Sequence, residues 1–156
     1  MKLLAKSLIT GLLAVTALTA TAQTAKSQKH ADRTLKMRQS VFTLIGSNMG
    51  ALGAMAKGKI PVNAELAKKN ATRINQLSFM IEDYLRTDTS KFKLETDALD
   101  NIWQEQEKFN KRISALIEAS ENLKIAADSG DESAIKKAIG RVGKSCGGCH
   151  DDFKAE

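Results

Sequence analysis

Regularly spaced apolar residues along four stretches of the chain are the strongest constraint on its fold. In the first stretch they recur at alternating steps of three and four, a spacing that places them on one face of a long helix. Gly58 and Pro61, in "KGKIP", would end that helix. Aromatic residues make up only 4% of the chain, which also favours helices over sheets. The stripe consists of Leu35, Arg38, Phe42, Ile45, Met49, Leu52 and Ala56.

Three later stretches repeat this pattern. Asn63 can cap the second helix and Asp131 the fourth, while Ser129-Gly130 would end the third. The polar segment 86–97 reads as the longest connection. The three stripes are Ala67, Ala71, Ile74, Leu77, Ile81 and Leu85; then Ile102, Phe109, Ile113, Leu116, Leu123 and Ala127; then Ile135, Ala138, Val142, Cys146, Cys149 and Phe153. We therefore expect an all-α protein, an antiparallel four-helix bundle with helices crossing at about 20°.

The N-terminal segment has the pattern of an export signal. Two lysines precede an apolar run over residues 8–18, and Ala20-Thr21-Ala22 forms a small-x-small cleavage site. This predicts a Sec-type signal peptide over residues 1–22 and a periplasmic protein. The apolar run is shorter than the roughly 20 residues of a membrane span, so no anchor is expected after cleavage. We interpret residues 23–33 as a flexible lead-in and residues 34–156 as the bundle domain.

The charge of the chain argues against nucleic acid as a partner. The formal net charge is +6, and removing a signal peptide with two lysines and no acidic residue leaves +4. There is no arginine-rich block, and basic residues do not alternate with aromatic ones, so nucleic-acid binding is not expected. Lys137, Arg141 and Lys144 lie on one side of the fourth helix. They could dock an acidic redox partner, and an ordinary solvated face is the alternative.

Both cysteines of the chain lie in "KSCGGCHDDF", residues 144–153. On a helix, Cys146, Cys149 and His150 stand at i, i+3 and i+4 and share one face, which here continues the apolar stripe. C-x-x-C-H is the attachment motif of haem c. Two thiols one turn apart can each join a vinyl group of one porphyrin, and the adjacent imidazole can ligate its iron. We therefore expect one covalently bound haem c in the bundle core.

Other chemistries fit the motif less well. A thioredoxin-like pair needs a βαβ setting and no histidine after the second cysteine. A zinc site needs about four ligands, and the only other histidine, His30, lies in the lead-in. A disulfide within one helical turn would be strained. A structural or signalling bundle in which the motif is accidental is a further class, and colourless protein would support it. We find no nucleophile–base pairing, and we do not expect an enzyme.

Two residues of the first helix point to the haem environment. Arg38 interrupts an apolar stripe with a permanent charge, which a haem propionate could pair; the alternatives are snorkelling to the surface or a stripe offset by one residue. Phe42 follows one turn later and cannot ligate iron, so it can lie over an open coordination position. Met37, Met49 and Met55 are nearby, although a methionine on such a stripe is more often core filler.

At these residues the chain resembles cytochrome c′, of the class II c-type cytochromes. The similar segments are "KMRQSVFTLIGSNMGAL", "IWQEQEKF" and "VGKSCGGCHDDFK", within residues 34–154. The resemblance implies a periplasmic four-helix bundle that is often a homodimer, to which exposed Val41 and Leu44 could contribute. It implies thioether bonds at Cys146 and Cys149 and a proximal ligand at His150.

The resemblance also assigns the first-helix residues. It places the propionate-side arginine at Arg38 and the distal residue at Phe42, where cytochromes c-556 carry a ligating methionine. Lys154 departs from the family, many of whose members have arginine there. We therefore expect five-coordinate, high-spin iron that binds the small gases NO and CO, with possible electron transfer to an unidentified partner. The alternative is a low-spin, methionine-ligated electron carrier of the cytochrome c-556 type.

Overall fold

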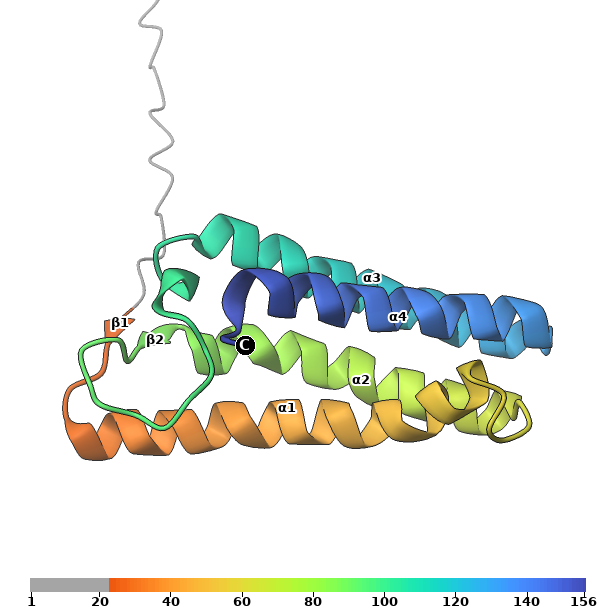
Figure 1. Cartoon of the computed structure of the whole chain (residues 1–156), viewed down its shortest axis with the longest axis horizontal. Coiled ribbons are helices and arrows are strands. Elements are labelled where there is room, and N and C mark those ends of the chain that lie inside the picture. The colour runs from red at the N-terminus through yellow and green to blue at the C-terminus, as the bar shows by residue number, and fades with distance from the viewer. Residues whose placement is uncertain (1–22) are drawn as a thin grey trace, which may run out of the picture.

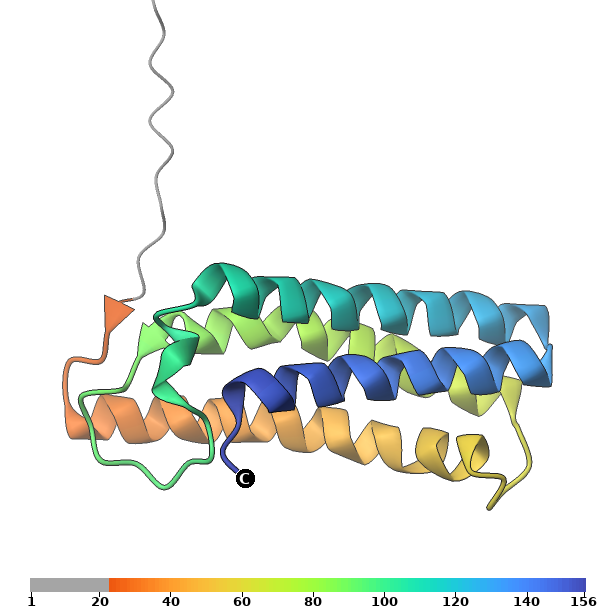
Figure 2. The ribbon, with the colours of Figure 1, turned by 45° about the horizontal axis from the view of Figure 1, so that its top comes forward.

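The protein is an all-α four-helix bundle, as the apolar spacing predicted (Figure 1). The computed structural model describes residues 23–156, so the expected signal peptide lies outside the described residues. Each helix runs antiparallel to the next, and α4 returns to lie beside α1 (Figure 2). In the described part, no helix is long and apolar enough to cross a membrane. The helices are α1 (Gln28–Ala56), α2 (Ala64–Leu85), α3 (Gln106–Ser129) and α4 (Glu132–Phe153).

Capping residues fix the ends of these helices where the sequence placed them. The Asn63 side chain accepts a hydrogen bond from the Leu66 amide at the start of α2. At the start of α4, one carboxylate oxygen of Asp131 accepts from two backbone amides. Gly130, between α3 and α4, has φ of 70°, a left-handed conformation in which glycine avoids the strain of a side chain. The α3–α4 turn is therefore tight, and it aligns the two helices closely.

The N-terminal segment is more ordered than its polar composition suggested. Ser27 caps α1, which begins at Gln28 and so includes six residues of the lead-in expected over 23–33. Before it, β1 (Gln23–Thr24) pairs in parallel with β2 (Thr87–Asp88). A polar run can form a capped helix when its neighbours supply hydrogen-bond partners, and composition alone does not reveal those partners.

The buried face of α1 differs in part from the predicted stripe. Leu35, Arg38, Ile45 and Leu52 are buried as expected. Ala31 is also buried, ahead of the predicted stripe, and the other three buried positions each precede a predicted one by one residue. Steps of three and four fit either choice at these positions, and packing against the neighbouring helices selects the residue three positions after Arg38, Ile45 and Leu52. The structure thus buries Val41, Asn48 and Met55 in place of Phe42, Met49 and Ala56.

This displacement corrects the expectation for Val41 and accounts for the position of Phe42. Val41 was expected on an exposed dimer surface, but it is 4% exposed and belongs to the core. Leu44 is 50% exposed, as expected. Phe42 is 43% exposed and lies beside the core instead of inside it. Its ring is therefore free to line a cavity.

The connection between α2 and α3 closes one end of the bundle. It contains β2 and a 3-10 turn, Asp100–Ile102. The Leu99 amide donates to the Phe153 carbonyl at 3.0 Å, and the Ala155 amide donates to the Asp97 carbonyl at 2.7 Å. These bonds hold the connection against the last turn of α4, where the cysteine–histidine motif lies.

Candidate functional site

A cavity of ≈610 Å³ lies at this closed end, within the size range of small-molecule sites. Residues of all four helices and of the α2–α3 connection form its wall, which is largely apolar. Phe42 contributes from α1 and Cys149 from α4, so two residues predicted from distant parts of the sequence meet in one site. The apolar part of the wall consists of Leu35, Phe42, Leu85, Ala98, Ile102, Phe109 and Phe153.

The two cysteines are free thiols on the side of α4 that packs against the core. Both are half-buried, and Cys149 also lines the cavity. Burial raises the pKa of Cys149 to about 11, although the positive charge of Arg112 acts in the opposite direction. Burial likewise raises the pKa of Cys146. The pair therefore consists of protonated thiols one helical turn apart at neutral pH.

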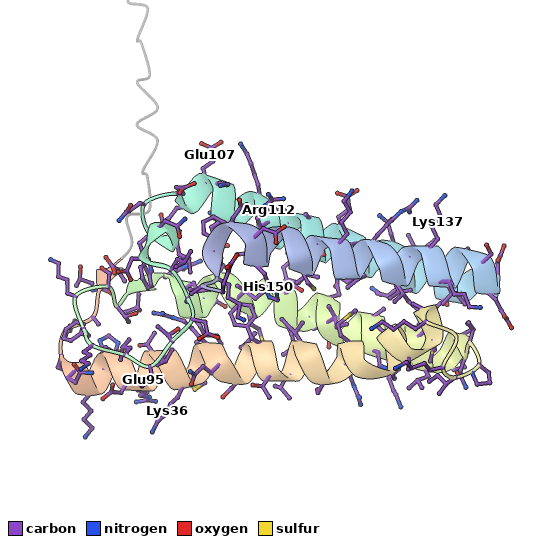
Figure 3. All side chains as sticks on the ribbon, viewed as in Figure 1. Lys36, Glu95, Glu107, Arg112, Lys137 and His150 are labelled. Atoms are coloured by element: carbon purple, nitrogen blue, oxygen red, sulfur yellow. The ribbon has the colours of Figure 1, made fainter. Side chains whose placement is uncertain are left out.

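His150 lies at the edge of the site. Its side chain is exposed and is not part of the cavity wall, whereas the sequence predicted that it would point into the bundle with the cysteines. Figure 3 shows His150 on the side of α4 that is turned toward α1 and α2. Because each helical residue advances by about 100°, the residue after Cys149 leaves the buried stripe. An exposed imidazole at this edge is available as a ligand.

Arg38 is buried in the wall of the cavity and is 4% exposed. Its Nε donates to the Tyr84 carbonyl at 2.9 Å, Nη2 to the Thr87 carbonyl at 2.7 Å, and Nη1 to the Thr89 hydroxyl at 3.1 Å. The guanidinium carbon also lies 5.1 Å from the centre of the Trp103 ring. Sequence reasoning expected a haem propionate to pair with this charge, or the side chain to reach the surface; within the protein, neutral oxygens of the 84–89 segment bind it.

These contacts leave part of the guanidinium free. Arginine has five N–H donors, and three of the Arg38 donors are used within the protein. Burial lowers the pKa of Arg38 to about 10, with the nearby negative charge of Asp88 raising it in part. The side chain remains a cation at neutral pH and can still bind an anionic group that enters the cavity.

The methionines and the second histidine lie away from the cavity. Within residues 23–156, the cavity wall contains neither methionine nor histidine. Met37 is 41% exposed, Met55 is fully buried in the core, and Met49 packs beside the core. His30 lies near the start of α1, where its Nδ1 accepts from the Lys26 amide.

One ionic cluster beside the motif was missed by sequence reasoning. Asp152, two residues after His150, accepts from Arg112 Nε at 2.8 Å and lies 3.0 Å from Lys108 Nζ. Hydrogen bonds from Lys108 and then Arg112 hold the pKa of Asp152 below its ordinary value. The cluster ties the last turn of α4 to α3. The sequence carried no signal for it, because the partners are 40 residues apart and all three residue types are common on helix surfaces.

The residues at this site fit a haem. The cavity offers apolar walls for a porphyrin, free thiols for its attachment, an accessible imidazole beside them and a buried cation with free donors. No group of three or more histidine, cysteine or carboxylate residues in the described part could hold a separate metal ion. The donor set therefore favours a prosthetic group over a bare metal.

Comparisons with known proteins agree with this interpretation. The sequence model of the family described as Cytochrome C′ matches residues 33–154. Cytochrome c′ of Halomonas halodenitrificans is 39% identical over 128 residues, which cover 76% of this chain and 93% of that protein.

Two solved structures extend the similarity to the fold. Cytochrome c prime from Shewanella frigidimarina has a TM-score of 0.72 and 34% identity over 84% of this chain and 98% of its own. A ferrous variant of cytochrome c prime from Alcaligenes xylosoxidans with bound NO has a TM-score of 0.71 and 30% identity, with the same coverage. With its C-x-x-C-H motif at the cavity, the chain belongs to the cytochrome c′ family, which binds one covalently attached haem c.

Proposed function

We propose that the protein is a periplasmic haem protein with five-coordinate, high-spin iron that binds NO and CO. The observation that carries this proposal is the composition of the cavity wall: Phe42 lies in it, and no methionine or histidine of residues 23–156 does. When bound, haem supplies an iron that can take a neutral diatomic molecule wherever the protein leaves a coordination position free.

Cys146 and Cys149 would hold the haem covalently. Each S–H adds across one vinyl double bond, so that sulfur bonds one carbon and hydrogen the other. Their spacing of one turn matches two attachment points on one porphyrin. His150, adjacent to Cys149 and exposed at the cavity edge, would be the proximal iron ligand. Its position beside the tether restricts which face of the porphyrin it can reach.

Arg38 and Phe42 would shape the rest of the site. The free donors of Arg38 can pair with a propionate, while its existing bonds to the 84–89 segment keep the guanidinium in place. Phe42 presents an apolar ring with no ligating atom, so it favours small neutral ligands over bulky or anionic ones. Ligand binding, and not catalysis, is the role that these residues support.

The NO ligand is also supported by a relative, because the Alcaligenes xylosoxidans structure is that of a ferrous cytochrome c prime with bound NO. The competing function is that of a low-spin electron carrier of the cytochrome c-556 type. That function needs a methionine at the iron, and the four methionines of residues 23–156 lie elsewhere. To bring one into the cavity, α1, which carries Met37, Met49 and Met55, or α2, which carries Met80, would have to rearrange.

A homodimer through α1 and α2 completes the proposal. These helices expose Leu44, Phe79 and Met80, at 50%, 59% and 38%. Leu44 and Met80 also line a hollow of ≈640 Å³ between the two helices. A second copy could bury this apolar surface. Sedimentation velocity would show a dimer, and Leu44→Glu would convert it to monomer; a monomeric native protein would contradict this part of the proposal.

Optical titration tests the main proposal. The holoprotein is produced with the cytochrome c maturation machinery, reduced, and titrated with CO and then with NO. A spectral change with each gas is expected, since the sixth position is free. An unchanged ferrous spectrum after CO addition would contradict the proposal. The double variant Cys146→Ala/Cys149→Ala is the control, and it should lose covalently bound haem.

A further inference from the structure

A row of unpaired positive charges runs along α4 toward the turn that carries Cys146 and Cys149. Between residues 133 and 150, α4 contains four lysine and arginine residues and no acidic one. All four are exposed, and none forms a salt bridge within residues 23–156. Figure 3 shows Lys137 pointing away from the bundle. We call this set the α4 cations: Lys136, Lys137, Arg141 and Lys144.

Two of the α4 cations border a hollow of ≈550 Å³ between α3 and α4. Arg141 and Lys144 form part of its wall, together with Gly147 and Gly148 of the C-x-x-C-H motif. Gly147 leaves the backbone of the turn that carries Cys146 and Cys149 open to the hollow, whereas the Arg112 guanidinium lies over Gly148. A partner seated here would approach the haem more closely than at a surface covered by long side chains.

We propose that the hollow and the α4 cations form the docking surface for an acidic one-electron carrier protein. This rests on the proposed haem attachment and adds the partner class. During the encounter one electron passes from the partner's reduced centre to the ferric iron, which becomes ferrous; no covalent bond forms or breaks. Opposite charges guide such encounters and fix their orientation, which raises the association rate.

A protein fits this surface better than an anionic membrane. The surface is concave, and Glu118 and Asp151 lie in it beside the cations. A surface with both signs of charge can match a folded partner that carries the complementary charges. The carboxylates of the same surface would repel a uniformly anionic bilayer. Ile125, on the same helix as Glu118, is 61% exposed and offers an apolar contact of the kind found inside protein interfaces.

The test uses the ferric holoprotein and an acidic flavodoxin as the probe. Binding of oxidised flavodoxin is measured by calorimetry at about 0.01 M and 0.15 M ionic strength, because screening distinguishes charge-driven docking. Electron transfer is then measured by stopped flow with the flavin hydroquinone anion, which becomes the neutral semiquinone as it donates one electron. The expected result is binding and rapid reduction that both weaken as salt rises.

Two triple variants with the same charge change separate docking from net charge. The test variant is Lys137→Gln/Arg141→Gln/Lys144→Gln. The control is Lys29→Gln/Arg33→Gln/Lys36→Gln, which removes two lysines and one arginine from α1. At low ionic strength the test variant should bind flavodoxin and accept its electron about tenfold less well than the control. Equal effects of the two variants would overturn the proposal.

Two further experiments test whether the partner approaches over Gly147 and whether the surface binds a membrane instead. Gly147→Gln fills open space and should slow reduction by flavodoxin but not by dithionite, while Gly50→Gln, also in open space on α1, should change neither. The protein should not bind vesicles that contain phosphatidylglycerol. The proposal would be overturned if the native protein bound these vesicles, the α4 triple variant did not, and both bound flavodoxin equally well. CO titration of each variant reports separately on the gas site, so failure there is distinguishable from failure of docking.

Discussion

The Arg38 Nη2 donates a 2.7 Å hydrogen bond to the Thr87 carbonyl, and so joins α1 to strand β2. Together with the bonds from Nε and Nη1, it holds the 84–89 segment across one wall of the cavity. The same guanidinium thus supports the fold and presents free donors to the proposed haem. Its two roles can be separated by experiment.

Replacing Arg38 should reduce stability more than its charge alone would suggest. Arg38→Ala leaves buried carbonyl oxygens without donors, and we expect the free energy of unfolding to fall by about 3 kcal/mol. Arg38→Lys keeps the charge but cannot reach three acceptors at once, so it should cost about 2 kcal/mol. Denaturant unfolding of the holoprotein, followed by circular dichroism, measures both. The exposed Arg33→Ala is the control; an equal loss there would contradict the role of Arg38.

Phe42→Met should convert the protein toward the low-spin class. The variant places a thioether in the cavity wall where the native residue has an apolar ring. We expect a six-coordinate, low-spin ferric spectrum and loss of CO binding by the ferrous form. Phe42→Ala should instead keep the high-spin state and bind CO faster, because it removes bulk from the cavity.

Met37 provides the matched control for this change. It is exposed and lies outside the cavity wall, so Met37→Leu should leave the spin state and CO binding unchanged. A low-spin native protein that becomes high-spin in Met37→Leu would show that Met37 is the ligand and that the distal assignment of Phe42 is wrong.

Asp152 should make stability depend on acidity. Its folded pKa is depressed by Lys108 and Arg112, so its contribution is present above the ordinary aspartate pKa of about 3.9 and is lost as pH falls below it. Asp152→Asn should therefore melt at a lower temperature than the native protein at neutral pH, with the difference shrinking below about pH 4. Thermal melts across this range measure it.

Asp151→Asn is the control for that titration. Asp151 is exposed and forms no salt bridge within the described residues. Its substitution should shift the melting temperature little, and by the same amount at each pH. A pH-independent difference between Asp152→Asn and the native protein would contradict the proposed ionic cluster.

The two glycines of the motif should respond differently to alanine. A side chain at Gly147 would meet no atom within 4 Å, so Gly147→Ala should stabilise α4 by up to about 1 kcal/mol through helix propensity. A Cβ at Gly148 would lie 3.0 Å from Arg112 Nη1, so the guanidinium must move and its bridge to Asp152 must weaken. Gly148→Ala should gain less. Equal stabilisation in denaturant unfolding would contradict this contact.

The sequence predicted the features that follow from local periodicity and spacing. Helix caps at Asn63 and Asp131, the stop at Gly130 and the bundle itself depend on neighbours along the chain. Phe42 lies in the cavity wall one turn after Arg38, although the predicted stripe placed Phe42 in the core.

Long-range polar partners were not predictable in the same way. Bonds from Arg38 to the 84–89 segment, and from Arg112 to Asp152, join residues 40 or more positions apart. The one-residue displacement that buries Val41 arises from the geometry of packing against other helices, which a single-helix pattern cannot report.

Electron paramagnetic resonance of the resting ferric holoprotein tests the central claim most directly. It reports the spin state of the iron and therefore whether a strong sixth ligand from the protein is present. We predict a high-spin signal, since Phe42 faces the cavity and no methionine or histidine of the described residues lines it. A low-spin signal from the native protein, with a methionine sulfur or second imidazole on the iron, would contradict it.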